Sequence, residues 1–439
     1  MIFDSGKKMN NFMLGYDLGD EVSQISYLAS DSDAPETLSV LAGAEMFNIP
    51  TILCKRKGVN QWFYGKDAAK KIASLETDME VLPVTNLVTK AKTGEKIHID
   101  DRDYDPVSLL TLFIKRSLSL LSMEMSLDHI SSIMFTTASL DKKMIEILSR
   151  VTRGLDLANC VVLYQSYEES FFYYMLYQPT DLWTQDVLAI YYNFGTVSVY
   201  ELEQNRYTSP IVITVGESDH DELAMDGAAL PSEDNAKKQA LTDLDDKFMD
   251  LLKEICNGKT ISSVFLLGDG FKEKWMSSSL EYLCRNRRVF QGNNLFSKGA
   301  SIAAKERMLP GDVSSKYVLL GEDKLKYNIG MNLYRQGKES YYALMDAGIN
   351  WYEVSASLDI ILEDGNSIDF VIVPISKGKE RSTVTMELLG LPERERSMTR
   401  LHVALEMSAP DKISVKVADM GFGELVPSEG LRWDREIEL

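Results

Sequence analysis

The sequence predicts an α/β fold in the first three quarters of the chain and an antiparallel β domain in the last quarter. Strand-like and helix-like segments alternate up to about Pro310, an order typical of α/β proteins. From residue 351 onward, apolar and polar residues alternate with period two, as in half-buried antiparallel strands. Two apolar runs flank a glycine twice, at Gly19 and at Gly195, so we expect two duplicated halves in the α/β part.

The first half begins with two strands over residues 12–28, joined by a turn at Gly19. Apolar residues at helical spacing predict a helix over 106–121. The other elements expected in this half are, in order, an extended stretch that ends at Gly65, a helix over 66–75, a strand over 130–136, a helix over 142–152, a strand over 161–164 and an aromatic-rich helix over 168–177.

The second half repeats this layout with strands over 187–192 and 196–202. Residues 217–246 are acidic and alanine-rich, and we expect a solvated connection there that leads into a helix ending at Ile255. A buried strand is expected over 261–267, and a helix of small residues over 299–305. The β part beyond has turn residues at 364–366, 376–378 and 410–411, and a charged surface loop around Arg394.

Composition excludes several classes of protein. The 439 residues predict two to four domains. Asp and Glu number 66 against 47 Lys and Arg, a net charge of -19, which argues against nucleic acid and anionic membranes as partners. The start, 1–11, is polar, and no apolar run is long enough to span a bilayer, so we expect a cytoplasmic location. Four scattered cysteines and four isolated histidines predict neither a disulfide framework nor a structural zinc site.

Several short segments occur in a distinctive order along the chain. They are Gly15-Tyr16-Asp17-Leu18-Gly19, Tyr64-Gly65-Lys66-Asp67-Ala68-Ala69-Lys70, Asn193-Phe194-Gly195-Thr196-Val197-Ser198, Gly268-Asp269-Gly270-Phe271, Gly299-Ala300-Ser301-Ile302-Ala303 and Leu388-Leu389-Gly390-Leu391-Pro392. In this order they resemble the DnaK-type heat-shock chaperones, whose nucleotide-binding domain has the actin fold. The resemblance runs over nearly the whole chain.

The resemblance implies a magnesium-nucleotide site, holding ATP or ADP. Gly15, Asp17 and Gly19 correspond to the family's first phosphate loop, where the carboxylate acts on magnesium through water. Lys70 corresponds to the lysine that reaches the γ-phosphate, so Asp17 and Lys70 are the catalytic candidates. The remaining nucleotide-binding candidates implied by the resemblance are Asn193, Gly195 and Thr196 of the second phosphate loop and Gly268 and Gly270 of the adenosine motif.

The chain departs from the family pattern where phosphate would bind. Asn193 and Ser198 replace two acidic residues, and two glycines of the second loop are missing. Asn cannot act as a base or hold the water shell of magnesium as a carboxylate does. Ser166 stands where the family has its catalytic Glu, and Asp20 and Glu21 replace small hydroxyl residues. We therefore expect the fold to be kept and ATP hydrolysis to be lost.

The fold expected from the resemblance is an actin-like two-lobed α/β domain, made of duplicated ribonuclease-H-like units, followed by an antiparallel β-sandwich. The interval 199–264 is short, so the outer subdomain of the second lobe is expected to be reduced. The expected boundaries are 1–316 for the α/β domain, with lobes over 12–185 and 186–316, then a linker over 317–326 and the sandwich over 327–439. The family's helical lid has no counterpart before Leu439.

The leading hypothesis is a DnaK-like protein with a vestigial nucleotide site that binds a peptide or a protein partner. One alternative is a divergent, active ATP-dependent chaperone. Another is an actin-like structural protein, although a C-terminal β domain adds a binding module rather than a filament contact. The sequence leaves the partner and the oligomeric state open.

Overall fold

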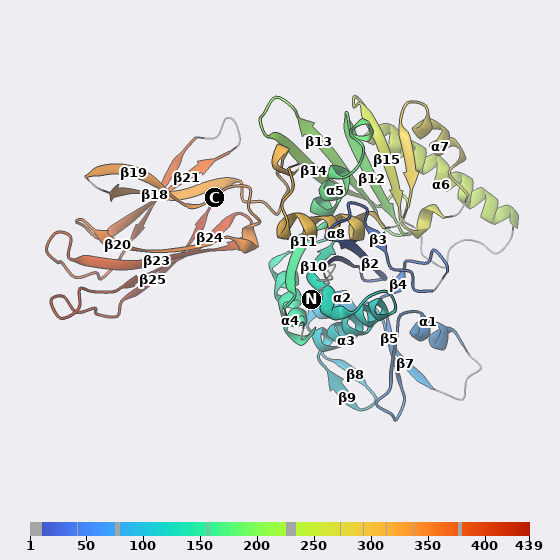
Figure 1. Ribbon diagram of the computed structural model, residues 1–439, viewed down its shortest axis with the longest axis horizontal. Helices are drawn as coiled ribbons and strands as arrows, with labels where there is room; N and C mark the ends of the chain where they lie inside the picture. The colour runs from blue at the N-terminus through green and yellow to red at the C-terminus, as the bar shows by residue number, and fades with distance from the viewer. Residues whose placement is uncertain are drawn as a thin grey trace, which may run out of the picture. The chain divides into compact units, whose positions relative to one another are not determined.

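The computed structural model divides the chain into two compact units, Met1–Leu319 and Leu320–Leu439 (Figure 1). The structure describes residues 11–41, 43–74, 80–155, 157, 159–224, 234–272, 274–292, 294–312, 314–335, 337–375 and 380–439. The expected polar start therefore lies outside the described residues except for Asn11, as does the turn expected at 376–378. The expected linker, 317–326, spans the division between the units.

A mixed sheet forms the centre of the first half of unit 1. Its strand order is β11-β10-β1-β2-β3, and β4 also pairs with β2. Strands β1 and β2 form an antiparallel hairpin, whereas β10 runs parallel to both β1 and β11. The strands are β1 (Phe12–Leu18), β2 (Val22–Ala29), β3 (Glu36–Thr37), β4 (Ile49–Pro50), β10 (Ile130–Thr137) and β11 (Val161–Ser166).

The second half of unit 1 has a sheet with the same topology. Its order is β16-β15-β12-β13-β14-β17, in which β12 and β13 form the antiparallel hairpin and β15 runs parallel to β12. Its first five strands match β11, β10, β1, β2 and β3 of the first sheet position by position, so the two halves are structural repeats. The strands are β12 (Asp186–Tyr192), β13 (Val197–Asn205), β14 (Ile211–His220), β15 (Ile261–Leu267), β16 (Arg288–Gln291) and β17 (Tyr317–Leu319).

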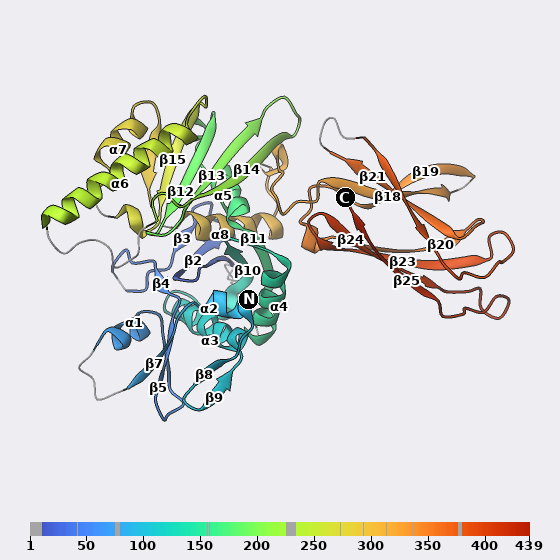
Figure 2. The same ribbon diagram turned by 180° about the vertical axis from the view of Figure 1, so that it is seen from behind.

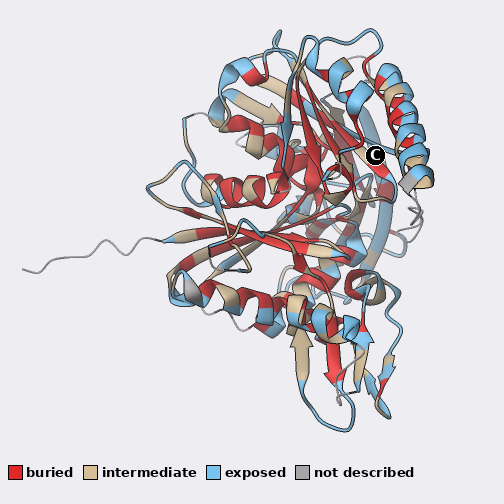
Figure 3. Ribbon diagram, turned by 90° about the vertical axis from the view of Figure 1, so that its right-hand side faces the viewer, coloured by how far each residue is buried: buried red, intermediate tan, exposed pale blue. Residues whose placement is uncertain are grey.

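Two helices, α5 (Tyr167–Leu176) and α8 (Leu295–Met308), lie between these sheets (Figures 1 and 2). Small residues of α8 pack on β1 and β10, where Ala300 and Ala304 contact Met13 and Met134. Phe171 and Phe172 of α5 pack with Phe296 of α8 against the second sheet. Both sheets therefore bury a face against the same helix pair, and Figure 3 shows these strands as largely buried.

The outer faces of the two sheets have their own helices. Helix α3 (Pro106–Leu118) contacts the first sheet through a buried hydrogen bond between the Tyr16 and Ser117 hydroxyls, 2.7 Å long. Helices α6 (Asp234–Ile255) and α7 (Ser277–Cys284) supply the core on the far side of the second sheet, which includes Phe248 and Leu283. Helix α4 (Lys142–Leu155) packs against α3.

The repeats differ most in what is inserted between the hairpin strands and the following helix. In the first half, residues 38–105 separate β3 from α3, whereas in the second half only 221–233 separate β14 from α6. The longer insertion contains β4 and the elements β5 (Leu53–Arg56), β6 (Trp62–Tyr64), α1 (Gly65–Ala73), β7 (Val81–Val84), α2 (Leu87–Thr93), β8 (Ile97–Ile99) and β9 (Arg102–Tyr104).

Unit 2 consists of two four-stranded antiparallel sheets, seen as two layers in Figures 1 and 2. In β23, buried residues alternate with more exposed ones, as period two requires. The first sheet has the order β19-β18-β21-β22, with β18 (Tyr327–Arg335), β19 (Lys338–Met345), β21 (Ser367–Pro374) and β22 (Ser382–Glu387). The second has the order β20-β23-β24-β25, with β20 (Ser355–Leu362), β23 (Thr399–Ala409), β24 (Lys412–Asp419) and β25 (Arg432–Glu438).

Two local expectations were wrong. The acidic stretch 217–246 is not a solvated connection at either end, because β14 continues to His220 and α6 begins at Asp234, while 225–233 lie outside the described residues. Hydroxyl groups of β13 donate to carboxylates of β14: Ser198 to Asp219 at 2.7 Å and Tyr200 to Glu217 at 2.6 Å. The second error concerns Arg394 itself, because its side chain is buried whereas Arg396 and Glu395 of the same loop are exposed, as expected. The Arg394 guanidinium donates twice to the fully buried carboxylate of Asp419, at 2.8 and 2.7 Å.

Among the described residues, no helix is both long enough and apolar enough to cross a membrane.

Candidate functional site

The expected phosphate-site residues come from the ends of β1 and β12 and from the loop after β15. Asp17, near the end of β1, is only 8% exposed. The Tyr167 hydroxyl, at the start of α5, donates a hydrogen bond of 2.6 Å to Asp17 Oδ1. Burial raises the pKa of Asp17 to about 7, although the hydrogen bond from Tyr167 lowers it. Asp17 is therefore a buried carboxyl with a protein donor already in place.

Tyr167 is held in this position by aromatic packing. Its ring stacks on Phe296 of α8, with centroids 3.9 Å apart and planes 3° from parallel. Tyr200 of β13 meets the Tyr167 ring edge-on at 6.3 Å. Burial, followed by the charge of Asp17, keeps the pKa of Tyr167 well above its usual value, so this hydroxyl remains a donor. A well-packed ring thus fixes the partner of Asp17.

Packing accounts for both glycines of the expected first phosphate loop. A Cβ on Gly15 would lie 2.0 Å from the carbonyl oxygen of Ser297 and 2.4 Å from the nitrogen of Ser301. Gly15 is thus required for the close approach of α8 to β1. A Cβ on Gly19 would lie 2.5 Å from the carbonyl oxygen of Val22, within the hairpin turn itself. Neither glycine needs a bound phosphate to explain it.

The acidic residues of the hairpin turn make contacts with other parts of the protein. Asp20 caps α2, since its Oδ1 accepts from the amide of Val88 at 2.8 Å and its Oδ2 from the Thr89 hydroxyl at 2.7 Å. Glu21 Oε2 accepts from Asn193 Nδ2 at 2.6 Å. The last contact joins the turn of the first hairpin to the turn of the second.

Asn193 belongs to a chain of hydrogen bonds that joins the two halves of unit 1. We call this chain of hydrogen bonds the polar bridge. Its members are Gln24, Asn48, Asp269, Asn193 and Glu21. Gln24 donates to Asn48 at 2.6 Å, Asn48 donates to Asp269 at 3.0 Å, and the amide of Asp269 donates to Asn193 Oδ1 at 3.0 Å. The side-chain amide of Asn193 is thus used in both directions, as a donor to Glu21 and as an acceptor from Asp269.

The rest of the expected second phosphate loop is a tight turn. Phe194 has a φ of 63°, a conformation unusual for a residue with a side chain. A Cβ on Gly195 would meet nothing within 4 Å. The Thr196 hydroxyl donates to Asp221 at 2.8 Å. Gly195 is therefore the one expected site glycine that faces open space, and its neighbours bond within the protein.

The expected adenosine motif packs against a tyrosine. A Cβ on Gly268, where φ is 98°, would lie 2.2 Å from the carbonyl oxygen of Tyr192. A Cβ on Gly270 would lie 2.4 Å from Cδ1 of the Tyr192 ring. Tyr192 is fully buried and packs with Phe271 and Trp275. Gly268 thus permits close contact with the backbone of Tyr192, and Gly270 permits close contact with its ring.

Lys70 is not joined to the other candidates. It is an exposed residue in the last turn of α1, and among the described residues no hydrogen bond or ion pair links its side chain to Asp17. Ser166, at the expected position of the catalytic Glu, is the N-cap of α5 and accepts from the amide of Glu169 at 3.5 Å. Its role in the structure is therefore to begin a helix.

Four residues of this region were missed in the sequence: Tyr167, Tyr192, Asn48 and Asp269 as a bridging carboxylate. Tyr167 directly follows Ser166 and Tyr192 directly precedes Asn193, so both lie beside expected site residues. Their positions next to Ser166 and Asn193 could have identified both tyrosines as candidates from the sequence. Asn48 lies far from every motif along the chain, and only the fold brings it to Asp269.

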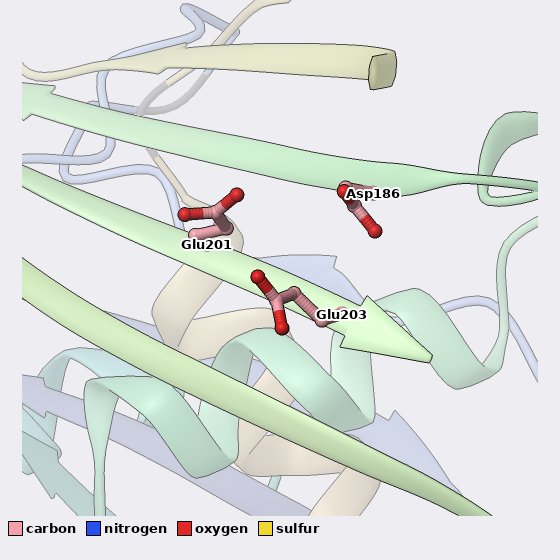
Figure 4. A group of neighbouring side chains, drawn as sticks. All are labelled: Asp186, Glu201 and Glu203. Atoms are coloured by element: carbon pink, nitrogen blue, oxygen red, sulfur yellow. The ribbon is translucent and has the colours of Figure 1, made fainter. Parts of the chain in front are cut away.

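Three carboxylates outside this region also lie close together. Asp186 of β12 and Glu201 and Glu203 of β13 bring one oxygen each to within 4.8 Å of the others (Figure 4). Burial, and then the charges of Glu203 and Glu201, raise the pKa of Asp186. Lys259 forms an ion pair with Glu201, so part of this negative charge is compensated within the protein. Sequence reasoning had selected none of these residues.

Comparisons with known proteins give two family matches. A model described as a domain of unknown function (DUF8552) matches residues 324–439, which cover most of unit 2. A model described as the C-terminal part of a family of unknown function (DUF5716) matches residues 34–322. A search of curated proteins finds no match. Because the DUF5716 match covers more than half of the 439 residues, the chain belongs to the DUF5716 family.

Proposed function

We propose that this chain is a DnaK-like protein whose nucleotide site is vestigial and whose work is to bind a peptide or a protein partner in the cytoplasm. In this proposal unit 1 is an actin-like pair of ribonuclease-H-like lobes with a reduced outer subdomain in the second lobe. Unit 2 is a β-sandwich that acts as the binding domain.

The topology supports the fold assigned here. Both sheets of unit 1 have an antiparallel hairpin beside a parallel strand, and the order of the first five strands is the same in each. The short interval 221–233 in the second half, against 38–105 in the first, agrees with a reduced outer subdomain. The pairing of two four-stranded antiparallel sheets in unit 2 agrees with a sandwich.

The single observation that carries the loss of nucleotide chemistry is the environment of Asp17. A carboxyl that acts on magnesium must be ionised and must face the metal's water shell. Asp17 is 8% exposed, has a pKa of about 7 and accepts from Tyr167 at 2.6 Å. Gly15 is packed against Ser297, and Gly268 and Gly270 are packed against Tyr192, so three of the glycines that would let backbone approach a nucleotide are already in contact with the protein. These residues do not fit magnesium-ATP, and we derive no catalytic step from them.

A binding role follows from the same reasoning. Without a nucleotide cycle, unit 1 would act as a scaffold, and the recognition chemistry would lie on exposed surface. Unit 2 offers such surface: β19 is exposed along most of its length, and Tyr334 on β18 is 71% exposed.

The test is the dissociation rate of a fluorescent peptide from the full-length protein, with and without magnesium-ATP. A protein that does not bind the nucleotide cannot have its peptide affinity changed by it, since coupling needs a binding free energy. We expect the dissociation rate of the peptide to be the same, within error, with and without magnesium-ATP. Faster release with ATP would favour the active ATP-dependent chaperone, and failure to bind any peptide from an array of diverse sequences would contradict peptide binding.

A further inference from the structure

The hairpin of β18 and β19 in unit 2 combines an open sheet edge with unpaired positive charge. Strand β19 is the last strand of its sheet, and within the described part of the chain it pairs with β18 alone (Figure 1). Residues 338–343 are all exposed. An edge strand presents backbone donors and acceptors on its free side and is a template for pairing with another chain. This free edge can therefore take an extended segment.

Cations surround this edge. In unit 2, Lys326, Arg394, Arg396, Arg400, Lys412 and Lys416 form ion pairs with carboxylates. Among the described residues, Arg335, Lys338 and Arg381 form no ion pair, and neither do Arg432 and Arg435 on β25 of the other sheet. Three uncompensated cations beside a free edge favour an acidic partner.

The register shows that two of these cations repel each other. Arg335 and Lys338 are direct partners across the hairpin, and like charges at such positions destabilise a strand pair. Their exposed positions at the end of the hairpin offer room for an anion between them, which would relieve this repulsion. Glu339 is the next residue, but its register partner is Tyr334, and it projects to the opposite face.

Aromatic rings hold the other parts of this surface in place. Tyr341 lies over Gly330, since a Cβ there would be 2.6 Å from the ring Cζ. Arg381 lies 5.9 Å from the centroid of that ring and donates to Asn332 at 3.3 Å. Arg335 lies 5.6 Å from the Tyr342 centroid. Tyr341 and Tyr342 are both 39% exposed and project to opposite faces, so cation-aromatic pairs flank β19 on both sides.

We propose that β19 is a docking strand for an extended acidic peptide, which adds to the sheet edge and places its carboxylates beside Arg335, Lys338 and Arg381. This inference rests on the proposed function in that it names the site and the class of peptide within the binding unit. Backbone pairing supplies affinity, and the cations select acidic side chains on both faces of the added strand.

The experiment uses the full-length protein and a fluorescein-labelled peptide of repeating Glu-Glu-Val-Val, which presents glutamates on both faces of a strand. Its controls are the Lys-Lys-Val-Val repeat and an acidic repeat with N-methylated backbone. We expect saturable anisotropy for the acidic peptide, at least tenfold weaker binding of both controls, and an affinity that falls with salt. Equal binding of acidic and basic peptides, or of the N-methylated form, overturns the proposal.

The matched variants are Lys338→Glu and Arg432→Glu. The first places a carboxylate opposite Arg335, so the hairpin gains a favourable cross-strand pair and should not unfold. The second changes an exposed cation on β25 of the same unit. Lys338→Glu should weaken acidic-peptide binding at least tenfold with an unchanged or higher Tm, and Arg432→Glu should change it less than twofold. Equal effects of the two variants overturn the docking site.

The outcomes separate this inference from the function on which it rests. If other peptides bind and the acidic repeat is not preferred, the docking strand is wrong while the binding role stands. If no peptide binds the protein, the docking strand and peptide binding are both contradicted.

Discussion

Asp17 is the residue at which burial and ionisation conflict most clearly. Its pKa is raised from 3.8 to about 7, so the folded protein holds a proton there that the unfolded chain releases at lower pH. The folded state therefore binds more protons between these values, and stability falls as pH rises from about 4 to 7. Above pH 7 the carboxylate is ionised in both states, and the loss is complete.

Asp17→Asn should remove this pH dependence, because the amide oxygen still accepts from Tyr167 while the charge is gone. Relative to the wild type, we expect the variant to gain about 2 kcal/mol in free energy of unfolding between pH 5 and pH 8. Urea denaturation at both pH values measures this gain. Asp128→Asn, at an exposed position, is the control. A difference between variant and wild type that does not change with pH would contradict a raised pKa at Asp17.

Two glycines of unit 1, Gly299 and Gly195, differ in how much room their surroundings leave for a side chain. A Cβ at Gly299 would lie 1.9 Å from the carbonyl oxygen of Ser170, at the contact between α8 and α5, whereas at Gly195 it would meet nothing within 4 Å. Gly299→Ala should cost roughly 3 kcal/mol through displaced backbone, despite the better helix propensity of Ala. Gly195→Ala should stay within about 0.5 kcal/mol. Equal thermal stability of the two variants would mean that the helices separate easily.

The sequence could place the candidate residues but not their partners. The turns at Gly19 and Asn193 were visible because two apolar runs flank each of them. The bond from Tyr167 to Asp17 joins residues 150 positions apart, so no local pattern contains it. The same holds for Asn48 and Asp269, which are 221 positions apart. Hydrogen bonds between residues far apart in the sequence form only in the folded chain. The chemical role of a carboxyl such as that of Asp17 depends on these bonds, so it could not be predicted from the sequence.

At the scale of elements, strand prediction worked where burial is uniform and failed where it is not. Strand β15 is buried at every position except Ser262, which is partly buried, and it was expected at its observed bounds, Ile261–Leu267. Strand β14 ends in the polar residues Gly216-Glu217-Ser218-Asp219-His220, which read as a connection. It extends that far because hydroxyls of β13 satisfy its carboxylates. Hydrophobic periodicity cannot detect a strand that is paired through polar side chains.

The polar bridge joins the turn of the β1–β2 hairpin to the turn after β12 and the loop after β15. Asn193→Asp tests its role, because Asp restores the acid expected from the chaperone family at this position. The substitution removes the donor to Glu21 and places a carboxylate beside it and near Asp269. We expect a loss of about 1–3 kcal/mol in free energy of unfolding by denaturant titration.

The control for that substitution is Asn257→Asp, at an exposed position after α6. It should leave stability unchanged within about 0.5 kcal/mol. If Asn193→Asp is equally neutral, the bridge does not hold the hairpin turn to the second half.

At the scale of the whole molecule, internal duplication was the most useful signal in the sequence. It rested on two glycine-centred turns, and the two sheets of unit 1 share one strand order. The period-two pattern after residue 351 indicated strands, and both sheets of unit 2 are antiparallel. Sequence alone could not show how tightly the site is packed, because the contacts of Gly15, Gly268 and Gly270 are with segments distant in sequence or fixed by tertiary structure.

We propose above that unit 1 no longer binds a nucleotide. Calorimetric titration of magnesium-ATP into the protein, with ADP as a control and thermal unfolding in parallel, tests this proposal. A ligand that binds the native state must stabilise it, by about 2.7 kcal/mol at a hundred times its Kd. We expect no heat and no rise in Tm at millimolar nucleotide. Micromolar binding, weakened by Asp17→Ala, would contradict it and restore the divergent ATPase.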